Sequence, residues 1–156
     1  MTDDPRIGRS PFRVRFDECG PDGLLRTSVL MRYAQDLASH HSALVGIDRA
    51  WYAERGIGWL VRAAEVAILA PLRVGDALQG ATQAVGFRRV WARRRTEFHD
   101  ADGALVAWSH IDWVLLDSRG APTRSGARMA TSAARTSQPM PRSAYHARSI
   151  PTRAEW

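Results

Sequence analysis

The pattern of apolar positions between residues 27 and 45 predicts a long helix. Thr27 and Ser28 offer side-chain oxygens as N-caps, and Gly46 is a C-cap signal. Because the segment carries only one arginine and one aspartate, we expect most of its circumference to be covered, as in a central helix. The stripe recurs three and four positions apart and consists of Leu30, Tyr33, Ala34, Leu37, Ala38, His41, Leu44 and Val45.

Alternating apolar and polar residues predict strands on both sides of this helix. In PFRVRFD, residues 11–17, every second residue is Phe or Val. Asp48 is expected to cap a short helical turn that ends at Gly56, and DADG at residues 100–103 is a hairpin signal. The predicted strands cover residues 11–17, 58–71, 77–87, 90–99 and 104–117.

The order of these elements favours an α+β fold, in which one antiparallel sheet of five or more strands wraps around the helix. We expect one domain over residues 11–125, preceded by a disordered leader at residues 1–10. Residues 126–156 are rich in Ser, Pro, Ala and Arg. We expect this tail to be extended or disordered.

Composition narrows the expected location and partners of the protein. No segment approaches the length of a membrane-spanning run, the first ten residues contain no apolar core of a signal peptide, and Cys19 is the only cysteine. We therefore expect a soluble, cytoplasmic protein. The net charge is +6 without a single lysine, which either codon usage in a GC-rich genome or a basic surface for an anionic partner would explain. Since no nucleic-acid-binding motif is present, we expect neither nucleic acid nor a membrane as partner.

Several short motifs occur along the chain in one order. They are Glu18-Cys-Gly-Pro-Asp22, Leu30-Met31, Gln35-Asp36-x-Ala38-x-x-His41, Gly56-x-x-Trp59-Leu-Val-Arg62, Pro71-x-x-x-Gly75-Asp76, and Asp100-x-x-Gly103 followed by Trp113-Val-Leu-Leu-Asp117. By these motifs, residues 12–125 resemble the hotdog-fold thioesterases, and most of all the first of the two hotdog repeats in acyl-(acyl carrier protein) thioesterases. The resemblance implies hydrolysis of acyl thioesters of coenzyme A or acyl carrier protein. It also implies a homodimer or a dimer of dimers, with active sites at the subunit interface.

Two features differ from the pattern of that superfamily. The plant-type enzymes carry catalytic Asp, Asn and His residues in a second repeat, which these 156 residues do not contain. Another hotdog branch has a catalytic Asp in the loop before the helix, and Gly20 stands in its place here. Two other functions therefore stay open, namely a non-catalytic acyl-binding hotdog protein and a hotdog hydratase or dehydratase.

Thioester hydrolysis needs a carboxylate, and it needs N–H groups that stabilise the thioester oxygen. Asp36 is the favoured acid, because it lies on the central helix and the resemblance places an acid after Gln35. Glu18 and Asp22, in the preceding loop, are the alternatives. The helix N-terminus at Thr27 is expected to supply the N–H groups and so to bind substrate.

Other polar residues are weaker candidates. His41 lies within the apolar stripe, where a histidine is either a hydrogen-bonded core residue or a catalyst. Gln35 could position water or the thioester carbonyl. His110 and Asp112 share one strand face and could form a polar dyad. No spacing of His, Cys, Asp and Glu matches a metal motif, so we expect neither a metal nor a cofactor.

An arginine cluster marks one predicted strand and the turn before it. Either a phosphate or carrier-protein site or a solvated sheet face would explain it. We expect Arg93 and Arg95 to help bind the substrate. The cluster consists of Arg88, Arg89, Arg93, Arg94 and Arg95.

Overall fold

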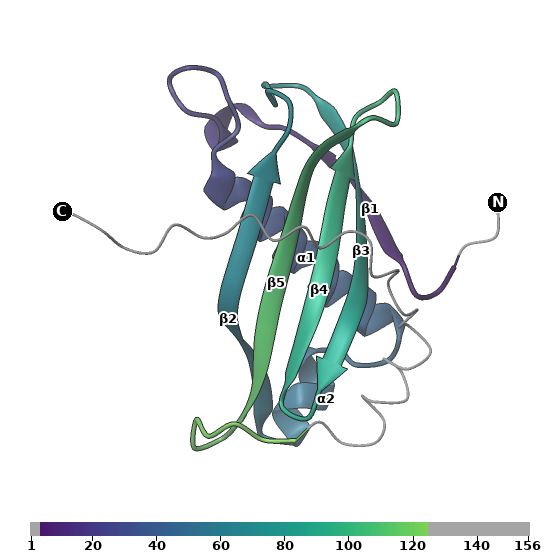
Figure 1. Cartoon of the computed structure of the whole chain (residues 1–156), viewed down its shortest axis with the longest axis vertical. Helices are drawn as coiled ribbons and strands as arrows, with labels where there is room; N and C mark the ends of the chain where they lie inside the picture. Colours follow the sequence, from purple (N-terminus) through teal and green to yellow (C-terminus); the bar gives the residue numbers. More distant parts are fainter. Residues whose placement is uncertain (1–3, 125–156) are drawn as a thin grey trace, which may run out of the picture.

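The protein folds as a curved sheet with one long helix across its concave face (Figure 1). The computed structural model describes residues 4–124. This is the expected α+β arrangement of a five-stranded antiparallel sheet around a helix. The elements are β1 (Gly8–Arg13), a 3-10 turn (Phe16–Glu18), α1 (Thr27–Leu44), α2 (Arg49–Glu54), β2 (Ile57–Ile68), β3 (Ala77–Arg88), β4 (Trp91–His99) and β5 (Leu105–Asp117).

All neighbouring strands of the sheet are antiparallel, in the order β1-β3-β4-β5-β2. The turn between β4 and β5 is the hairpin that the sequence predicts. There the Asp100 carboxylate accepts hydrogen bonds from the backbone N–H groups of Asp102 and Ala104, at 3.0 and 2.9 Å. Gly103 takes a φ of +83°, which glycine adopts at little cost. The order leaves β1 and β2 as the two edges.

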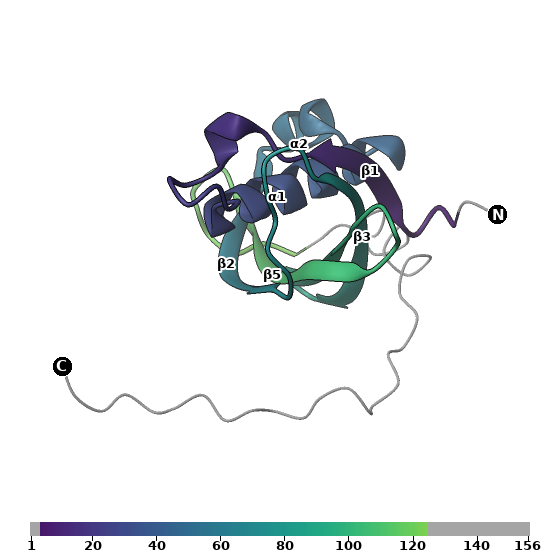
Figure 2. The ribbon, with the colours of Figure 1, turned by 90° about the horizontal axis from the view of Figure 1, so that it is seen from above.

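α1 packs on the sheet with one face only (Figure 2). The other face is exposed, and at the end of the helix Leu44 and Val45 are exposed too, by 67% and 41%. The expectation that most of the helix circumference is covered is therefore wrong for a single chain, because the sheet lies on one side of α1 only. The buried face consists of Val29, Leu30, Tyr33, Ala34, Leu37, Ala38 and His41.

The N-terminal half of α1 rests on a filled core. Leu30 and Phe98 are fully buried there, and the rings of Phe12 and Tyr33 stack at 4.5 Å between centroids. Gly80 permits this close approach, because a Cβ at that position would lie 2.8 Å from the Phe12 ring. Close packing at this end leaves the other end of α1 as the place for a cavity.

Both limits of the first strand differ from those expected, and the second strand ends at Ile68 and not at residue 71. β1 begins at Gly8, within the expected leader, because residues 8–13 pair with β3. The chain then turns away from the sheet, so that Phe16 lies in a 3-10 turn and is 85% exposed. The expected tail at residues 126–156 lies outside the described residues. Neither α1 nor α2 is long and apolar enough to cross a membrane.

Candidate active site

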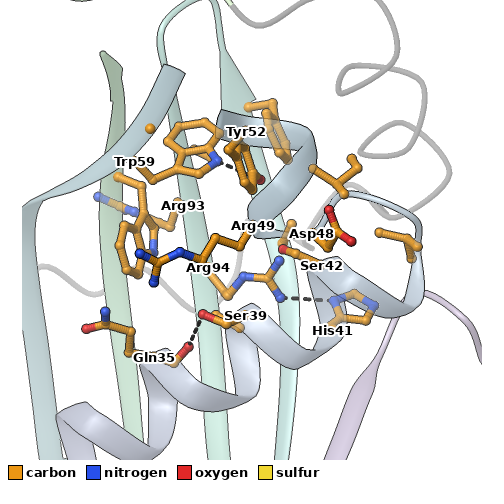
Figure 3. A pocket seen from close by; sticks show the side chains of 18 residues that line it. Gln35, Ser39, His41, Ser42, Asp48, Arg49, Tyr52, Trp59, Arg93 and Arg94 are labelled. Atoms are coloured by element: carbon orange, nitrogen blue, oxygen red, sulfur yellow. Dashed lines mark hydrogen bonds between the residues drawn. The ribbon is translucent and has the colours of Figure 1, made fainter. Parts of the chain in front are cut away.

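A cavity of about 480 Å³ lies under the C-terminal half of α1 (Figure 3). α1, α2 and strands β2 to β5 supply its walls. The large apolar side chains in the wall are Trp59, Phe87 and Trp113, whereas the polar groups include Gln35 and Ser39. This combination of size, apolar wall and few polar groups is typical of a small-molecule site.

α2 closes one side of the cavity. It begins where the Asp48 carboxylate accepts a hydrogen bond from the Trp51 N–H at 2.8 Å, which is an N-cap. The Tyr52 hydroxyl accepts a hydrogen bond from the indole N–H of Trp59 at 3.0 Å and so ties α2 to β2. Burial raises the pKa of Tyr52. The hydroxyl therefore keeps its proton at neutral pH and can donate it in a hydrogen bond.

Arg94 projects into this cavity from β4. One terminal nitrogen, Nη1, donates to Nδ1 of His41 at 3.1 Å, and it lies 3.5 Å from the hydroxyl of Thr82. Within residues 4–124, no carboxylate forms an ion pair with Arg94. Desolvation lowers the pKa of this guanidinium to about 10. Arg94 therefore remains a cation at neutral pH, although it is mostly removed from water.

His41 is held at both ring nitrogens. Since arginine can only donate, Nδ1 accepts from Arg94 and the proton sits on Nε2, which donates to the carbonyl oxygen of Pro5 at 3.1 Å. Burial is the main cause that lowers the pKa of His41. A neutral ring with both nitrogens occupied fits a core residue better than a proton-transfer catalyst.

Gln35 and Asp36 are neighbours on α1 but face different surroundings. The Gln35 side chain lines the cavity (Figure 3), while Asp36 does not line it and is exposed. In the part of the chain that the structure describes, Asp36 forms no ion pair. Its carboxylate is therefore open to a substrate or to a second protein surface.

Glu18 is bound within its own loop. Its Oε2 atom accepts hydrogen bonds from the Arg15 N–H at 3.0 Å and from the hydroxyl of Tyr33. Burial first, and then this bond to Glu18, raise the pKa of Tyr33 above its usual range. Because both donors bind the same carboxylate oxygen, Glu18 holds the loop against α1.

Asp22 occupies the space beside Gly20. Its Oδ1 atom accepts from the Leu24 N–H at 3.1 Å and would lie 2.9 Å from a Cβ added at Gly20. The loop leads into α1, whose N-cap is Arg26 without a side-chain hydrogen bond. Neither Thr27 nor Ser28 is thus the N-cap, and the first N–H groups of α1 are not capped by a side chain. An exposed carboxylate and a helix N-terminus therefore lie at the same end of α1.

Arg93 and Arg95 each pair with a carboxylate. Arg93 forms a two-point ion pair with Asp112, at 2.6 and 2.7 Å, and Arg95 approaches Glu97 at 2.5 Å. The Arg93 bond is the first cause that lowers the pKa of Asp112. Asp112 is thus the partner of Arg93, and no bond between it and His110 is present among residues 4–124. The dyad of His110 and Asp112 that the sequence allowed is therefore not formed, and the His110 ring lies 4.0 Å from Glu65.

The sequence interpretation missed most residues of the cavity. It gave no role to Trp59 or Tyr52 and did not single out Arg94 from its neighbours. Strand alternation could have singled out Arg94, because residues two apart in a strand share a face. Thr96 and Phe98, which share that face with Arg94, are buried.

Comparison with protein families identifies the chain. The model of the acyl-ACP thioesterase N-terminal domain matches residues 7–130. This chain belongs to that family. Comparison with curated proteins gives no significant match. Among the residues that the structure describes, no group of three or more His, Cys, Asp or Glu could hold a metal ion.

Solved structures share the fold at low identity. An oleoyl thioesterase (putative) from Lactobacillus plantarum is 19% identical with a TM-score of 0.80, over 96% of this chain and 58% of that one. An acyl-ACP thioesterase from Bacteroides thetaiotaomicron is 17% identical with a TM-score of 0.75, over 83% and 54%. A 1,4-dihydroxy-2-naphthoyl-CoA thioesterase from Synechocystis is 11% identical with a TM-score of 0.74, over 82% and 96%. The chain spans somewhat more than half the length of the first two.

Proposed function

We propose that this protein is an acyl thioesterase, which hydrolyses an acyl-CoA or acyl-carrier-protein thioester to the free acid and the thiol. The observation that carries the proposal is the cavity under α1 in a chain of the acyl-ACP thioesterase family. A cavity of about 480 Å³ with aromatic walls can hold an acyl group while the thioester stays at its mouth. The names of the three structural neighbours agree with acyl thioesters as the substrate class.

The carboxylate proposed for the reaction is Asp36. It accepts a proton from water as the water oxygen attacks the thioester carbon, after which the C–S bond breaks and the thiolate leaves. Its place supports this role, because it is exposed beside Gln35, whose side chain lines the cavity. Gln35 would orient the carbonyl or the water. Asp22 is the next candidate, since its carboxylate lies at the open N-terminus of α1.

The distance along α1 supports a homodimer. Asp36 lies nine residues after Thr27, or about 14 Å along the helix axis. Within a single copy, one thioester cannot contact both the Asp36 carboxylate and the N–H groups at Thr27. The N–H groups would therefore come from a second copy. The β2 edge offers a docking surface for that copy, because Leu60 and Val61 are exposed there by 55% and 38%. We propose a homodimer or a dimer of dimers with its sites at the interface.

The carrier would approach from the arginine-rich strand β4. Arg93 and Arg95 have carboxylate partners, but residues 88–99 carry five arginines against one glutamate and so form a positively charged stretch. We propose that this positive charge, to which Arg93 and Arg95 contribute, helps to hold the phosphates of coenzyme A or the acidic surface of a carrier protein. Both carriers would be met in the cytoplasm, where we place the protein.

The test of this function is release of free thiol from acyl-CoA and acyl-carrier-protein thioesters of several chain lengths. Hydrolysis by the purified protein is expected, and a thiol reagent would follow it continuously. If every thioester binds and none is hydrolysed, the protein is instead an acyl-binding hotdog protein.

Oligomeric state is tested separately, by sedimentation of the protein at micromolar concentration. Leu60→Lys should weaken the dimer, while Val74→Lys, an exposed apolar position in the turn between β2 and β3, should leave it intact. A monomer in the parent protein would refute the proposed assembly.

A further inference from the structure

The cavity under α1 contains a cation, Arg94, that no carboxylate of residues 4–124 neutralises. Arg94 donates through Nη1 to His41, which is neutral, and to Thr82. Some polar side-chain atoms of residues 4–124 are fully buried and have no hydrogen-bond partner, but no nitrogen of Arg94 is one of them. The nitrogens that do not bond His41 therefore remain reachable from the cavity.

The other charges around the cavity do not cancel this one. The Arg93 guanidinium is paired with Asp112. Of the lining residues within 4–124, only Asp48 carries a carboxylate, and it caps α2. Arg49, at the start of α2, adds a further cation to the lining (Figure 3). The cavity thus combines apolar walls with an excess of positive charge.

A plain hydrocarbon chain fits such a site poorly. Filling the cavity with an alkyl chain would remove the water that solvates Arg94 and leave a desolvated cation without a counter-charge, which is costly. A carboxylate in the same place would accept charge-assisted hydrogen bonds from the planar guanidinium. The Tyr52 hydroxyl, which also lines the cavity, offers a further hydrogen-bond donor.

We propose that the acyl group of the substrate ends in a carboxylate, and that Arg94 binds this carboxylate inside the cavity. The substrate class is then the monothioester of a dicarboxylic acid. This inference rests on the proposed function and specifies its substrate. Trp59, Phe87 and Trp113 contact the methylene chain, and the thioester lies at the mouth of the cavity.

Pairs of thioesters that differ only in this charge give the test. Glutaryl-CoA and isoheptanoyl-CoA have equal chain lengths, as do adipoyl-CoA and isooctanoyl-CoA, with an isopropyl group in place of the carboxylate. We expect kcat/KM to be about 10- to 100-fold higher for the charged member, the value of hydrogen bonds to a charged group. Rates without enzyme are subtracted, because short dicarboxylic thioesters also hydrolyse unaided.

Variants at position 94 assign the preference to this side chain. Arg94→Met removes the charge at similar length and should abolish the preference, chiefly through KM, while Arg94→Lys should retain part of it. Arg73→Met removes one charge from an exposed turn and serves as the control. Melting temperatures of all variants show whether each is folded.

Each outcome decides the matter. Equal rates within both pairs, or a parent enzyme that prefers the isopropyl members, would refute the carboxylate site while leaving the thioesterase activity in place. An equal loss on both members in Arg94→Met would make Arg94 a structural residue only. If no thioester is hydrolysed, the proposed function fails, and the same pairs then serve as ligands in calorimetry. Tighter binding of the charged members, lost in Arg94→Met, would still support the site, and equal binding would refute it.

Discussion

The two ends of α1 differ in charge and in packing. At its N-terminal end the helix rests on a filled core, and the loop before it carries the acids Glu18 and Asp22. At its C-terminal end the helix covers a cavity that contains the cation Arg94 and the neutral ring of His41. One helix thus has two acidic residues before one end and a cavity with a cation under the other. Asp36 lies between them, on the exposed face.

Under the proposed function, recognition and chemistry use different residues of this fold. Within residues 4–124, the side chains of Arg94 and His41 bond each other, and their further partners are Thr82 and the carbonyl of Pro5. The partners of the Glu18 carboxylate in the same range are the Arg15 N–H and the Tyr33 hydroxyl. Substitutions at the C-terminal end of α1, around the cavity, should therefore change which substrate is preferred. Substitutions on or beside the exposed face of α1 should change turnover.

The largest effect is expected at Asp36. Asp36→Asn keeps the shape and removes the base, and it should lower kcat by about 10²- to 10⁴-fold with little change in melting temperature. Asp22→Asn is the matched comparison at the N-terminal end of α1. The measurement is steady-state thiol release. If Asp36→Asn is folded, dimeric and as active as the parent, and Asp22→Asn is inactive, the chemistry belongs to the loop.

Substitution of a glycine near each end of α1 should change the free energy of unfolding by different amounts. A Cβ at Gly8 would lie 2.5 Å from the Cβ of His41, whereas a Cβ at Gly20 would meet only the exposed Asp22 carboxylate at 2.9 Å. Gly8→Ala should therefore cost about 1–3 kcal/mol of unfolding free energy, because His41 is held at both nitrogens and cannot move aside. Gly20→Ala should cost less than about 0.5 kcal/mol, because a flexible surface side chain can move. Urea denaturation measures both, and equal losses would contradict the packing difference.

A pH dependence of stability should arise at the cavity end. Burial lowers the pKa of His41 in the folded protein. Below about pH 6.5 the unfolded chain then binds a proton that the folded chain does not, so the free energy of unfolding falls as the pH drops and is fully restored above that value.

Urea denaturation at several pH values in this range measures how steeply the free energy of unfolding depends on pH. This dependence should be weaker in His41→Gln than in the parent protein. His110, whose pKa is also lowered, chiefly by burial, lies on β5, and His110→Gln is the matched comparison. An unchanged slope in His41→Gln would mean that the ring titrates as freely in the fold as in the unfolded chain.

The smallest effect is expected away from both ends, at the ion pair of Arg95 and Glu97. Arg95→Gln should raise KM for the carrier thioester by about 2- to 5-fold without changing kcat, because carrier binding is shared by ground and transition states. Glu97→Gln frees the guanidinium and should lower KM. Steady-state kinetics at low and high salt measure both, and identical KM values would make this pair part of a solvated surface.

Much of the fold could be predicted from local sequence. The stripe of α1 from Leu30 to His41, the hairpin at Asp100 and the alternation of the strands each follow from spacing and turn chemistry, and the structure confirms them. The stripe was predicted to continue to Leu44 and Val45, which are exposed. The order of short motifs likewise indicated the family that the comparisons identify. The first strand was displaced by a few residues, because its pairing with β3 sets its limits.

The site depended on tertiary structure. Three consecutive arginines of β4 look alike in the sequence, yet strand alternation turns Arg94 toward the helix, while Arg93 and Arg95 meet the carboxylates of Asp112 and Glu97. Which of them finds a counter-charge is decided by the neighbouring chain segments and not by the local pattern. The sequence by itself determined the helix, the strands and the family, because these follow from short-range periodicity. Only the packing of α1 and α2 on the sheet decided that Arg94 would lie in a cavity without a carboxylate partner from residues 4–124.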